Sequence, residues 1–393
     1  MSPSGAKENT LCRVAGGEQF CRPDSPRADT YKRKRASMKQ MKFSGRVEDA
    51  IRSALLAWFR RNARSLPWRK RRDPYAIWVS EVMLQQTQVA TVIPYYERFL
   101  EAFPTVANLA HAPLERVLQL WSGLGYYRRA RYLHQAAKEL VRSFAGAFPL
   151  DYKQIRSLPG VGEYTARAVL SIAFGLPYTL LDGNVARVLS RLVALRGNLH
   201  QPGFRRVVEA QLERLLSHRS PGDFNQSLME LGQILCLPRA PRCADCPLRS
   251  WCLGYKSGRP QLYPQPRPRR AAESHYLAAA ILQRGPRVAM VRGLGDGLLD
   301  DLWNFPSAFG PSRAEALVSL RNKLAGFGSL SLTLGDSIAE VHHGITYRSI
   351  HVHAYPAEIS NSPRKRGLRW FPISSLRQAA ISQLARKIAQ QVF

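Results

Sequence analysis

The chain has 393 residues and carries 58 lysines and arginines against 28 acidic residues, a formal net charge of +30. This surplus predicts a nucleic-acid partner, because neutralising phosphates releases their counterions. A membrane surface is the other anionic candidate, but there is no lipidation signal, basic amphipathic anchor, signal peptide or long apolar run. We therefore expect a cytoplasmic, nucleoid-associated protein that does not bind membranes.

Residues 1–44 form a polar, basic segment with the run Lys32-Arg33-Lys34-Arg35, a composition that predicts a disordered tail. Residues 45–256 are expected to form an all-α domain, because apolar residues recur there at spacings of three and four. Nine stretches show this period: Val47–Arg60, Tyr75–Gln86, Ala90–Ala102, Leu114–Leu120, Arg129–Phe144, Tyr164–Phe174, Val185–Leu195, Phe204–Ser217 and Phe224–Cys236.

Residues 257–274 are rich in proline and arginine, which predicts an extended linker. Residues 275–393 then show a different period and are expected to form a smaller α+β domain. Its expected strands are Tyr276–Leu282 and Val288–Val291 around a turn at Arg284-Gly285-Pro286, and Ile350–Tyr355; its expected helices are Arg313–Leu324 and Leu376–Val392.

Four cysteines, Cys236, Cys243, Cys246 and Cys252, stand at spacings of six, two and five intervening residues. A disulfide framework is excluded, because such scaffolds are cysteine-dense and this chain has only six cysteines. Structural zinc usually takes two close pairs set apart, whereas all-cysteine ligation of a [4Fe–4S] cluster accommodates uneven spacing. The spacing favours a [4Fe–4S] cluster, with zinc and unligated core cysteines as the alternatives.

The segment Ser157–Ala166 contains a Pro-Gly-Val-Gly turn, with glycines at Gly160 and Gly162, that opens into a helix. Free amides at a helix N-terminus suit a phosphate, and glycines let the backbone approach it closely. The plain alternative is an ordinary connection between two helices. The net charge and the cysteine motif favour binding to the DNA backbone.

Two carboxylates fall in contrasting contexts. Asp182 precedes an expected helix, where an aspartate is by default an N-cap but where an ionised carboxylate also suits a developing sugar cation. Glu81 shares a helical stripe with Ile77 and Leu84, so burial would raise its pKa and make it a candidate general acid. The alternative for Glu81 is a position at the edge of the stripe, bent out to water.

Together with these features, the ordered segments Leu66–Arg69, Ser80–Val89, Leu120–Ala130, Leu181–Val185 and Phe224–Gln226 resemble the MutY-type adenine DNA glycosylases of the helix-hairpin-helix superfamily. The resemblance runs from about Leu56 to the C-terminus. It implies a monomeric repair enzyme with a [4Fe–4S] cluster and little or no lyase activity. Such an enzyme hydrolyses the N-glycosidic bond of adenine opposite 8-oxoguanine or guanine in double-stranded DNA.

The resemblance also implies roles for individual residues. Glu81 would protonate adenine N7 and then position water, and Asp182 would stabilise the oxocarbenium ion at the sugar. Tyr164 and Asn184 would orient Asp182 and polarise the leaving base. The residues expected to line the adenine pocket are Trp68, Arg69, Leu84 and Gln226, and those expected to contact DNA are Gln86, Tyr126, Gly160, Gly162, Thr346 and Tyr347.

The α+β domain resembles the Nudix-related module with which this family reads 8-oxoguanine, on the basis of Leu302–Pro306. The segment Ser312–Ala325 has only one glutamate, Glu315, where a Nudix hydrolase needs several to bind metal, so we do not expect nucleotide hydrolysis. Where the family commonly has Phe-Ser-His in its lesion-reading loop, Ile345-Thr346-Tyr347 aligns here.

Two other functions are weighed against this one. An endonuclease-III-like glycosylase/lyase acting on oxidised pyrimidines shares the fold and cluster spacing, but needs a lysine nucleophile where this chain has Tyr164. A non-catalytic iron–sulphur redox sensor that binds DNA would keep the cysteines, hairpin and charge. It would have no need of Glu81 and Asp182 together.

Overall fold

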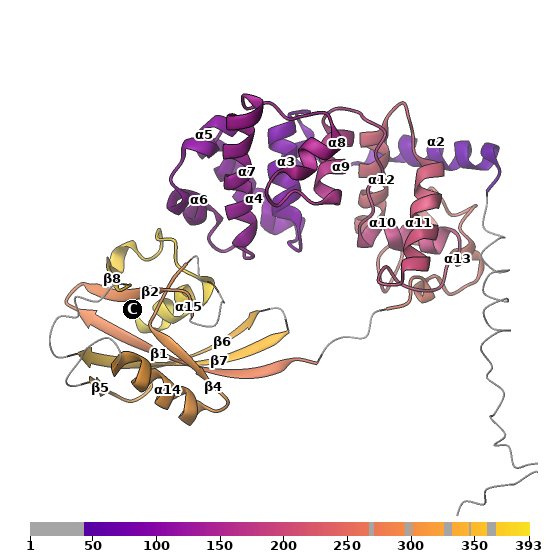
Figure 1. Ribbon diagram of the computed structural model, residues 1–393. Coiled ribbons are helices and arrows are strands. Elements are labelled where there is room, and N and C mark those ends of the chain that lie inside the picture. The colour runs from indigo at the N-terminus through magenta and orange to yellow at the C-terminus, as the bar shows by residue number, and fades with distance from the viewer. Residues whose placement is uncertain are drawn as a thin grey trace, which may run out of the picture. The chain divides into compact units, whose positions relative to one another are not determined.

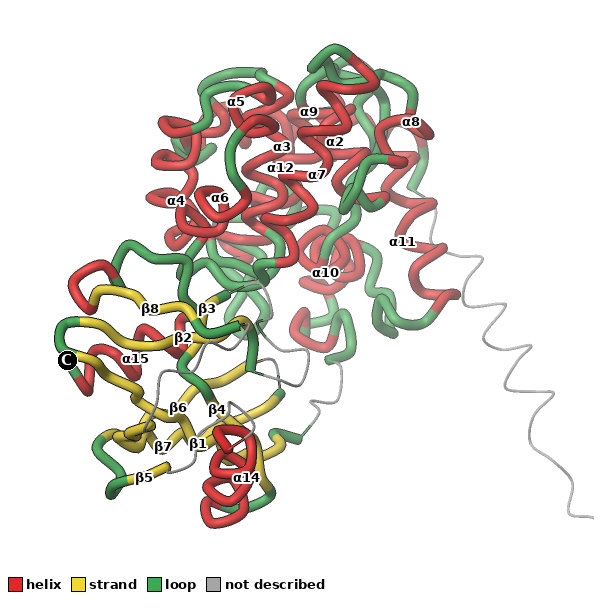
Figure 2. The backbone as a smooth tube through the Cα atoms, turned by 60° about the vertical axis from the view of Figure 1, so that its left-hand side comes forward, coloured by secondary structure: helices red, strands yellow, loops and turns green. Residues whose placement is uncertain are grey.

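The computed structural model describes residues 43–266, 271–294, 299, 302–325, 332–345, 347–359 and 367–393. These residues form a helical region followed in sequence by a strand-rich region (Figures 1 and 2). The two-part fold class expected from the periodicity is therefore confirmed. Within these ranges, no helix has the length and apolar character needed to cross a membrane.

Each of the nine expected helical stretches contains a helix. These are α2 (Gly45–Asn62), α3 (Pro74–Leu84), α4 (Val89–Ala102), α6 (Leu114–Trp121), α7 (Arg128–Phe144), α9 (Glu163–Ile172), α10 (Gly183–Leu192), α11 (Pro202–Leu215) and α12 (Pro221–Ile234). The further helical elements of this region are short: α5 (Val106–His111), α8 (Tyr152–Ser157), α13 (Leu253–Lys256), and the 3₁₀ turns η1 (Pro67–Arg69), η2 (Cys243–Asp245) and η3 (Pro260–Leu262).

Helix α3 shows how local sequence sets an element that carries function. Asp73 caps it by accepting a hydrogen bond from the amide of Tyr75 at 3.1 Å, and Pro74 occupies the first helical position, where no amide is needed. The helix is buried from Tyr75 to Met83. A helix that is apolar on all sides belongs in a core, so its one carboxylate is desolvated.

The strand-rich region is built on a sheet whose central order is β3-β2-β1-β7-β5, with β4 paired to β1, β6 to β7 and β8 to β2. Strands β1 and β7 are parallel, and the hairpin of β1 and β2 turns at Gly285, which has a φ of +51°. The bounds are β1 (Glu273–Arg284), β2 (Arg287–Arg292), β3 (Trp303–Asn304), β4 (Ser307–Gly310), β5 (Leu332–Leu334), β6 (Ala339–Ile345), β7 (Arg348–Ile359) and β8 (Arg369–Pro372).

Both faces of this sheet are covered. Alternate residues of β1, such as Leu277 and Ile281, pack in a cluster with α15 (Gln383–Val392), while Ala278 and Leu282 pack with α14 (Arg313–Ala325). The period-two alternation of a strand places the two sets on opposite sides. The helices α14 and α15 accordingly flank the sheet in Figure 1.

One expected helix was too long. The stretch Leu376–Val392 is helical only over α15, which begins at Gln383. Ser382 caps that helix by accepting from the amide of Ala385 at 2.9 Å, and the preceding Ile381 forms a β-bridge with Trp303. The serine cap and the bridge override the apolar spacing of the residues before Ser382.

Candidate active site

A cavity of about 740 Å³ lies in the helical region and brings together residues from α3, α9, α10, α12 and η1. A volume of several hundred cubic ångströms suits a small organic group such as a nucleobase. Nine of the residues singled out from sequence line it: Trp68, Arg69, Glu81, Leu84, Gln86, Tyr164, Asp182, Asn184 and Gln226.

Glu81 is buried, with 7 % of its surface exposed, and it lines the cavity beside Ile77 and Leu84. Burial raises the pKa of its carboxyl from 4.5 to about 7; a hydrogen bond from Tyr164 lowers it, the charge of Asp182 raises it and that of Arg69 lowers it. Glu81 is therefore not bent out to water. It is a carboxylic acid that keeps its proton up to neutral pH.

Asp182 occupies the N-cap of α10. Its Oδ1 accepts from the amide of Val185 at 2.7 Å, and its Oδ2 accepts from Nδ2 of Asn184 at 2.7 Å. Asn184 is itself held, because its Oδ1 accepts from Nη2 of Arg187 at 2.9 Å. These donors hold the Asp182 side chain in place, so the capping position and the cavity position are compatible.

Tyr164, on α9, lies between Glu81 on α3 and Met229 on α12. Its hydroxyl lies within hydrogen-bonding reach of Glu81 and, at 3.2 Å, of Sδ of Met229, and its single proton can go to either. Desolvation, followed by the charges of Glu81 and Asp182, raises the pKa of Tyr164 well above its usual value. The side chain is therefore a neutral phenol that can donate or accept beside Glu81.

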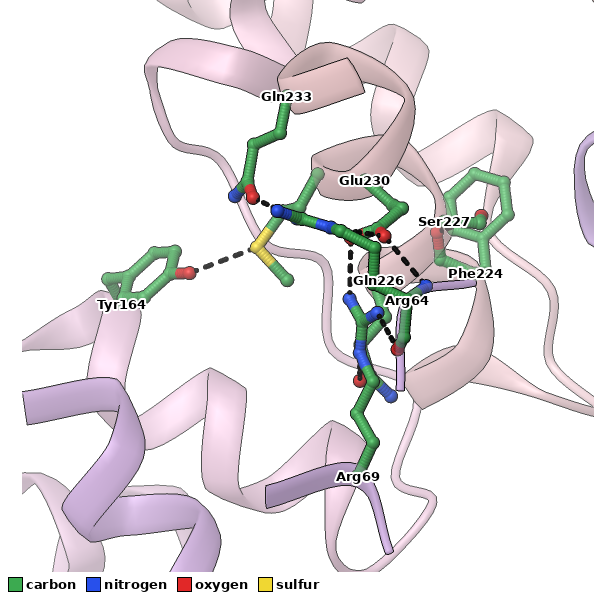
Figure 3. Close-up of polar contacts among 9 residues, drawn as sticks. Arg64, Arg69, Tyr164, Phe224, Gln226, Ser227, Glu230 and Gln233 are labelled. Carbon is green, nitrogen blue, oxygen red and sulfur yellow. Dashed lines mark hydrogen bonds and ion pairs between the residues drawn. The ribbon is translucent and has the colours of Figure 1, made fainter. Parts of the chain in front are cut away.

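Helix α12 contributes a polar stripe that sequence reasoning did not single out beyond Gln226. Figure 3 shows Glu230 between Arg64 and Arg69, with Gln226 and Gln233 on the same helix. Gln226, Glu230 and Gln233 stand at i, i+4 and i+7, so they share one face. This spacing of polar residues marks one face of the helix, but it is also the pattern of an exposed face, so it does not report burial. Glu230 has no side-chain exposure.

The residues of the helical region that the resemblance predicts to contact DNA do not all line the cavity. Gly160 has a φ of +71°, and a Cβ added at this position would lie 2.4 Å from Cβ of Tyr132. Gly162 is the N-cap of α9, and a Cβ added there would have no atom within 4 Å. Tyr126 is 47 % exposed and, like Gln86, has a positive φ (+49° and +57°). Gly160 and Tyr126 are not among the cavity-lining residues.

One guanidinium connects the segments that carry Gln86 and Tyr126. Arg129 donates to the carbonyls of Val82 and Met83 at 2.8 Å and, on the other side, to that of Gly125 at 3.1 Å. Its position over the ring of Tyr126, 5.4 Å from the centroid, adds a contact on the exposed side. Arg129 thus fixes the C-terminal end of α3, where the unsatisfied carbonyls of a helix gather.

The four cysteines come together, since all of them line one cavity. Burial is the main cause, and the neighbouring cysteines a lesser one, of a rise in the pKa of the Cys246 thiol to about 12. Nη1 of Arg191 lies 3.3 Å from Sγ of Cys236. Among the described residues, however, no three His, Cys, Asp or Glu side chains are arranged to hold a metal ion.

The lesion-reading residues expected in the strand-rich region lie at the connection of β6 and β7, whose last pair is Ile345 with Arg348. Thr346 is outside the described residues. Tyr347 is half-buried, and its carbonyl accepts from the amide of Glu273 at 2.9 Å.

The chain is similar to known proteins along most of its length. Residues 79–217 match the HhH-GPD superfamily of base excision DNA repair proteins. The adenine DNA glycosylase of Mus musculus is 34 % identical over 396 residues, covering 86 % of this chain and 77 % of that protein. That of Buchnera aphidicola subsp. Baizongia pistaciae is 43 % identical over 202 residues, covering 51 % of this chain and 57 % of that protein.

Among solved structures, a thermostable thymine-DNA glycosylase shares 29 % sequence identity with a TM-score of 0.49, covering 53 % of this chain and 97 % of that chain. The match to the mouse enzyme extends over more than two thirds of its length. The chain therefore belongs to the adenine DNA glycosylases, base-excision-repair enzymes of the HhH-GPD superfamily.

Proposed function

We propose that this enzyme removes adenine mispaired with 8-oxoguanine or guanine in duplex DNA, by base flipping and acid-assisted hydrolysis of the glycosidic bond. The observation that carries the proposal is the pairing, in one cavity, of a buried carboxyl with a pKa of about 7 and a carboxylate held by two hydrogen-bond donors. Two carboxyls in contrasting environments are what an acid and an ion stabiliser require.

Glu81 acts as the general acid in this proposal. Adenine is a poor leaving group unless its ring is protonated, and protonation at N7 demands a carboxylic acid that is neutral near pH 7. Tyr164 holds Glu81 and limits the rise of its pKa, so that the proton is available for transfer. After the base leaves, the ionised Glu81 can orient and deprotonate the attacking water.

Asp182 acts on the sugar. Loss of the base leaves an oxocarbenium ion, which a nearby fixed carboxylate stabilises most strongly where water is excluded. Asn184 and the Val185 amide hold the Asp182 carboxylate in place, so no reorganisation is needed when the charge develops. The chain has Tyr164 where a lyase would need its lysine, so we expect hydrolysis without β-elimination.

We further propose that the four cysteines hold a [4Fe–4S] cluster. Tetrahedral zinc would draw its sulfurs to within about 3.8 Å of one another, given a zinc–sulfur bond of about 2.3 Å. A cubane spreads the same ligands around a larger core. What supports the cluster is the uneven spacing of the four cysteines and the single cavity that all of them line. When bound, the cluster supplies a cross-link for the basic loop between Cys236 and Cys252.

The contacts to DNA and to the lesion complete the proposal. Gly160 and Gly162 offer hairpin amides to a phosphate, and Gln86 and Tyr126 probe the duplex around the mispair. Thr346 and Tyr347 read 8-oxoguanine at its N7–H and O8 from a Nudix-like domain. We place the domain boundaries at residues 45–256, 257–274 and 275–393.

The experiment is a single-turnover assay of the full-length, iron-loaded protein on duplexes with adenine opposite 8-oxoguanine, guanine or thymine. We expect release of adenine opposite 8-oxoguanine and guanine, little release opposite thymine, and no borohydride-trapped adduct. Absence of base release would favour a DNA-binding redox sensor, and efficient trapping on oxidised-pyrimidine duplexes would favour a lyase.

A further inference from the structure

The carboxylate of Glu230 receives four hydrogen bonds from two arginines. Its Oε1 accepts from the backbone amide and Nε of Arg64 at 3.0 and 2.7 Å, and its Oε2 accepts from Nη2 of Arg64 at 2.8 Å and Nη2 of Arg69 at 2.9 Å. Four donors occupy the lone-pair sites of a carboxylate. Burial alone would raise the pKa of Glu230, but the bonds from Arg64 and Arg69 lower it to about 2. Glu230 is thus a fixed anion and not a proton donor.

The guanidinium of Arg69 is held at all three nitrogens. Nη2 donates to Glu230, Nη1 donates to the Arg64 carbonyl at 3.1 Å, and Nε donates to Oε1 of Gln226 at 3.1 Å. One face of the guanidinium lies over the ring of Phe59, 5.3 Å from its centroid. Arg69 is therefore positioned by the protein before any base arrives.

This arrangement determines which way the Gln226 amide points. Arginine has donors only, so the Gln226 atom facing Nε of Arg69 must be the carbonyl oxygen. The amide NH₂ is what Gln226 has left to offer the cavity that it lines. Gln226 consequently presents a hydrogen-bond donor to the cavity.

We propose that Glu230 is a positioning residue for base selection: by fixing Arg69 it fixes the Gln226 amide, which presents its NH₂ to the unprotonated N1 of adenine. The proposal rests on the function proposed above. There, Glu81 takes the N7 side of the base and Asp182 the sugar side, which includes N3. The N1 edge is left for α12. Guanine and hypoxanthine carry a proton on N1, so the same donor would disfavour them.

A second effect follows from charge. Arg69 lowers the pKa of Glu81, whose other neighbouring ionisable groups are Tyr164 and Asp182. The negative charge of Glu230 offsets that of Arg69. Replacing Glu230 with a neutral residue strengthens the effect of Arg69, so Glu81 would lose its proton at a lower pH.

The test compares wild-type and Glu230→Gln enzymes in single-turnover release of adenine and of hypoxanthine from otherwise identical 8-oxoguanine duplexes, across pH. We expect adenine release to fall roughly 10- to 100-fold, as for loss of a fixed charged hydrogen bond, and hypoxanthine release to fall less. The midpoint at which adenine release is lost with rising pH should move to lower pH. Circular dichroism and thermal unfolding verify that the variant is folded.

Two further variants keep the inference testable if Glu230→Gln does not fold. Arg69→Lys keeps the charge but loses the planar fork, so it should lower the adenine-to-hypoxanthine ratio without moving the pH midpoint. Glu209→Gln is the matched control. Glu209 forms an ion pair with Arg205 on α11, with 2.7 Å between Oε1 and Nε, and its replacement should change neither the adenine-to-hypoxanthine ratio nor the pH midpoint.

The outcomes separate the inference from the function on which it rests. A folded Glu230→Gln enzyme with an unchanged ratio and midpoint, or an Arg69→Lys enzyme with an unchanged ratio, would overturn the positioning role. Equal loss for both bases with an unmoved midpoint would also overturn it, since that pattern reports general damage. Failure of the wild-type enzyme to release adenine would instead overturn the proposed function.

Discussion

Replacement of Glu81 by glutamine should stabilise the protein, and increasingly so as pH rises. The pKa of Glu81 is raised from 4.5 to about 7 in the folded state, so between these values the folded state binds a proton that the unfolded state has released. Stability of the wild type therefore falls as pH rises through this window. Glutamine keeps the shape of the protonated acid but never ionises.

The magnitude follows from the width of the window. The difference between about 7 and 4.5 is 2.5 pH units. At about 1.36 kcal/mol per unit, burial of the ionised carboxylate costs about 3 kcal/mol above neutral pH and nothing well below the unfolded value. About 2.5 kcal/mol of the advantage of Glu81→Gln should develop between about pH 5 and about pH 9. Because Glu81 is buried, solvent screening does not reduce this figure.

The assay is urea unfolding, followed by circular dichroism, of both proteins at several pH values. The exposed pair Arg205–Glu209 supplies a control, since Glu209→Gln should change the free energy of unfolding by less than about 1 kcal/mol. The same Glu81→Gln protein should bind lesion duplex but release no adenine. A stability difference that stays flat with pH would show that the Glu81 carboxyl is not desolvated, and would remove the basis for its role as acid.

Wild-type adenine release should slow as pH rises through about 7, because Glu81 must carry a proton. A single-turnover rate that does not change over that pH range would contradict this. Asp182→Asn should abolish release while duplex binding persists, and an active variant would leave Asp182 as a plain helix cap. Gly160→Ala should weaken DNA binding and lower the melting temperature, whereas Gly162→Ala should keep the fold, since only the first meets a neighbour within 3 Å. Purified protein should carry about four irons; Cys246→Ser should lose iron, stability and DNA affinity together, and full iron content in that variant would exclude Cys246 as a ligand.

The helices that apolar spacing predicted are those long enough to show a period. Helices α5 and α8 have six residues each, too few for that signal. They are set by caps, in which Thr105 and Asp151 accept from amides three residues on, and by packing that no local pattern reports. The same limit explains why the short strands β3, β4, β5 and β8 were not predicted, whereas β6 has seven residues and was missed for another reason.

The residues of the candidate site also differ in whether the sequence reveals them. Glu81 could be predicted, because its place on an apolar stripe reports burial directly. Glu230 could not, because a glutamate on a helix is usually exposed, and its partner Arg64 is 166 positions away in the sequence. Only the folded chain shows that these charges neutralise one another inside the protein.

The central strands β1 and β2 are buried on both faces of the sheet. Six consecutive residues of β1, Leu277 to Leu282, are buried, and so are the four central residues of β2, because a helix covers each side of the sheet. Proteins that stack bases on a sheet need one bare face with exposed aromatic rings. The described parts of β1 and β2 therefore stabilise the core, and we expect nucleic acid to approach this region at strand ends and connections such as that between β6 and β7. Directed changes of base preference in this region should be sought at those tips, where the chain can vary in length and residue type without disturbing either core layer.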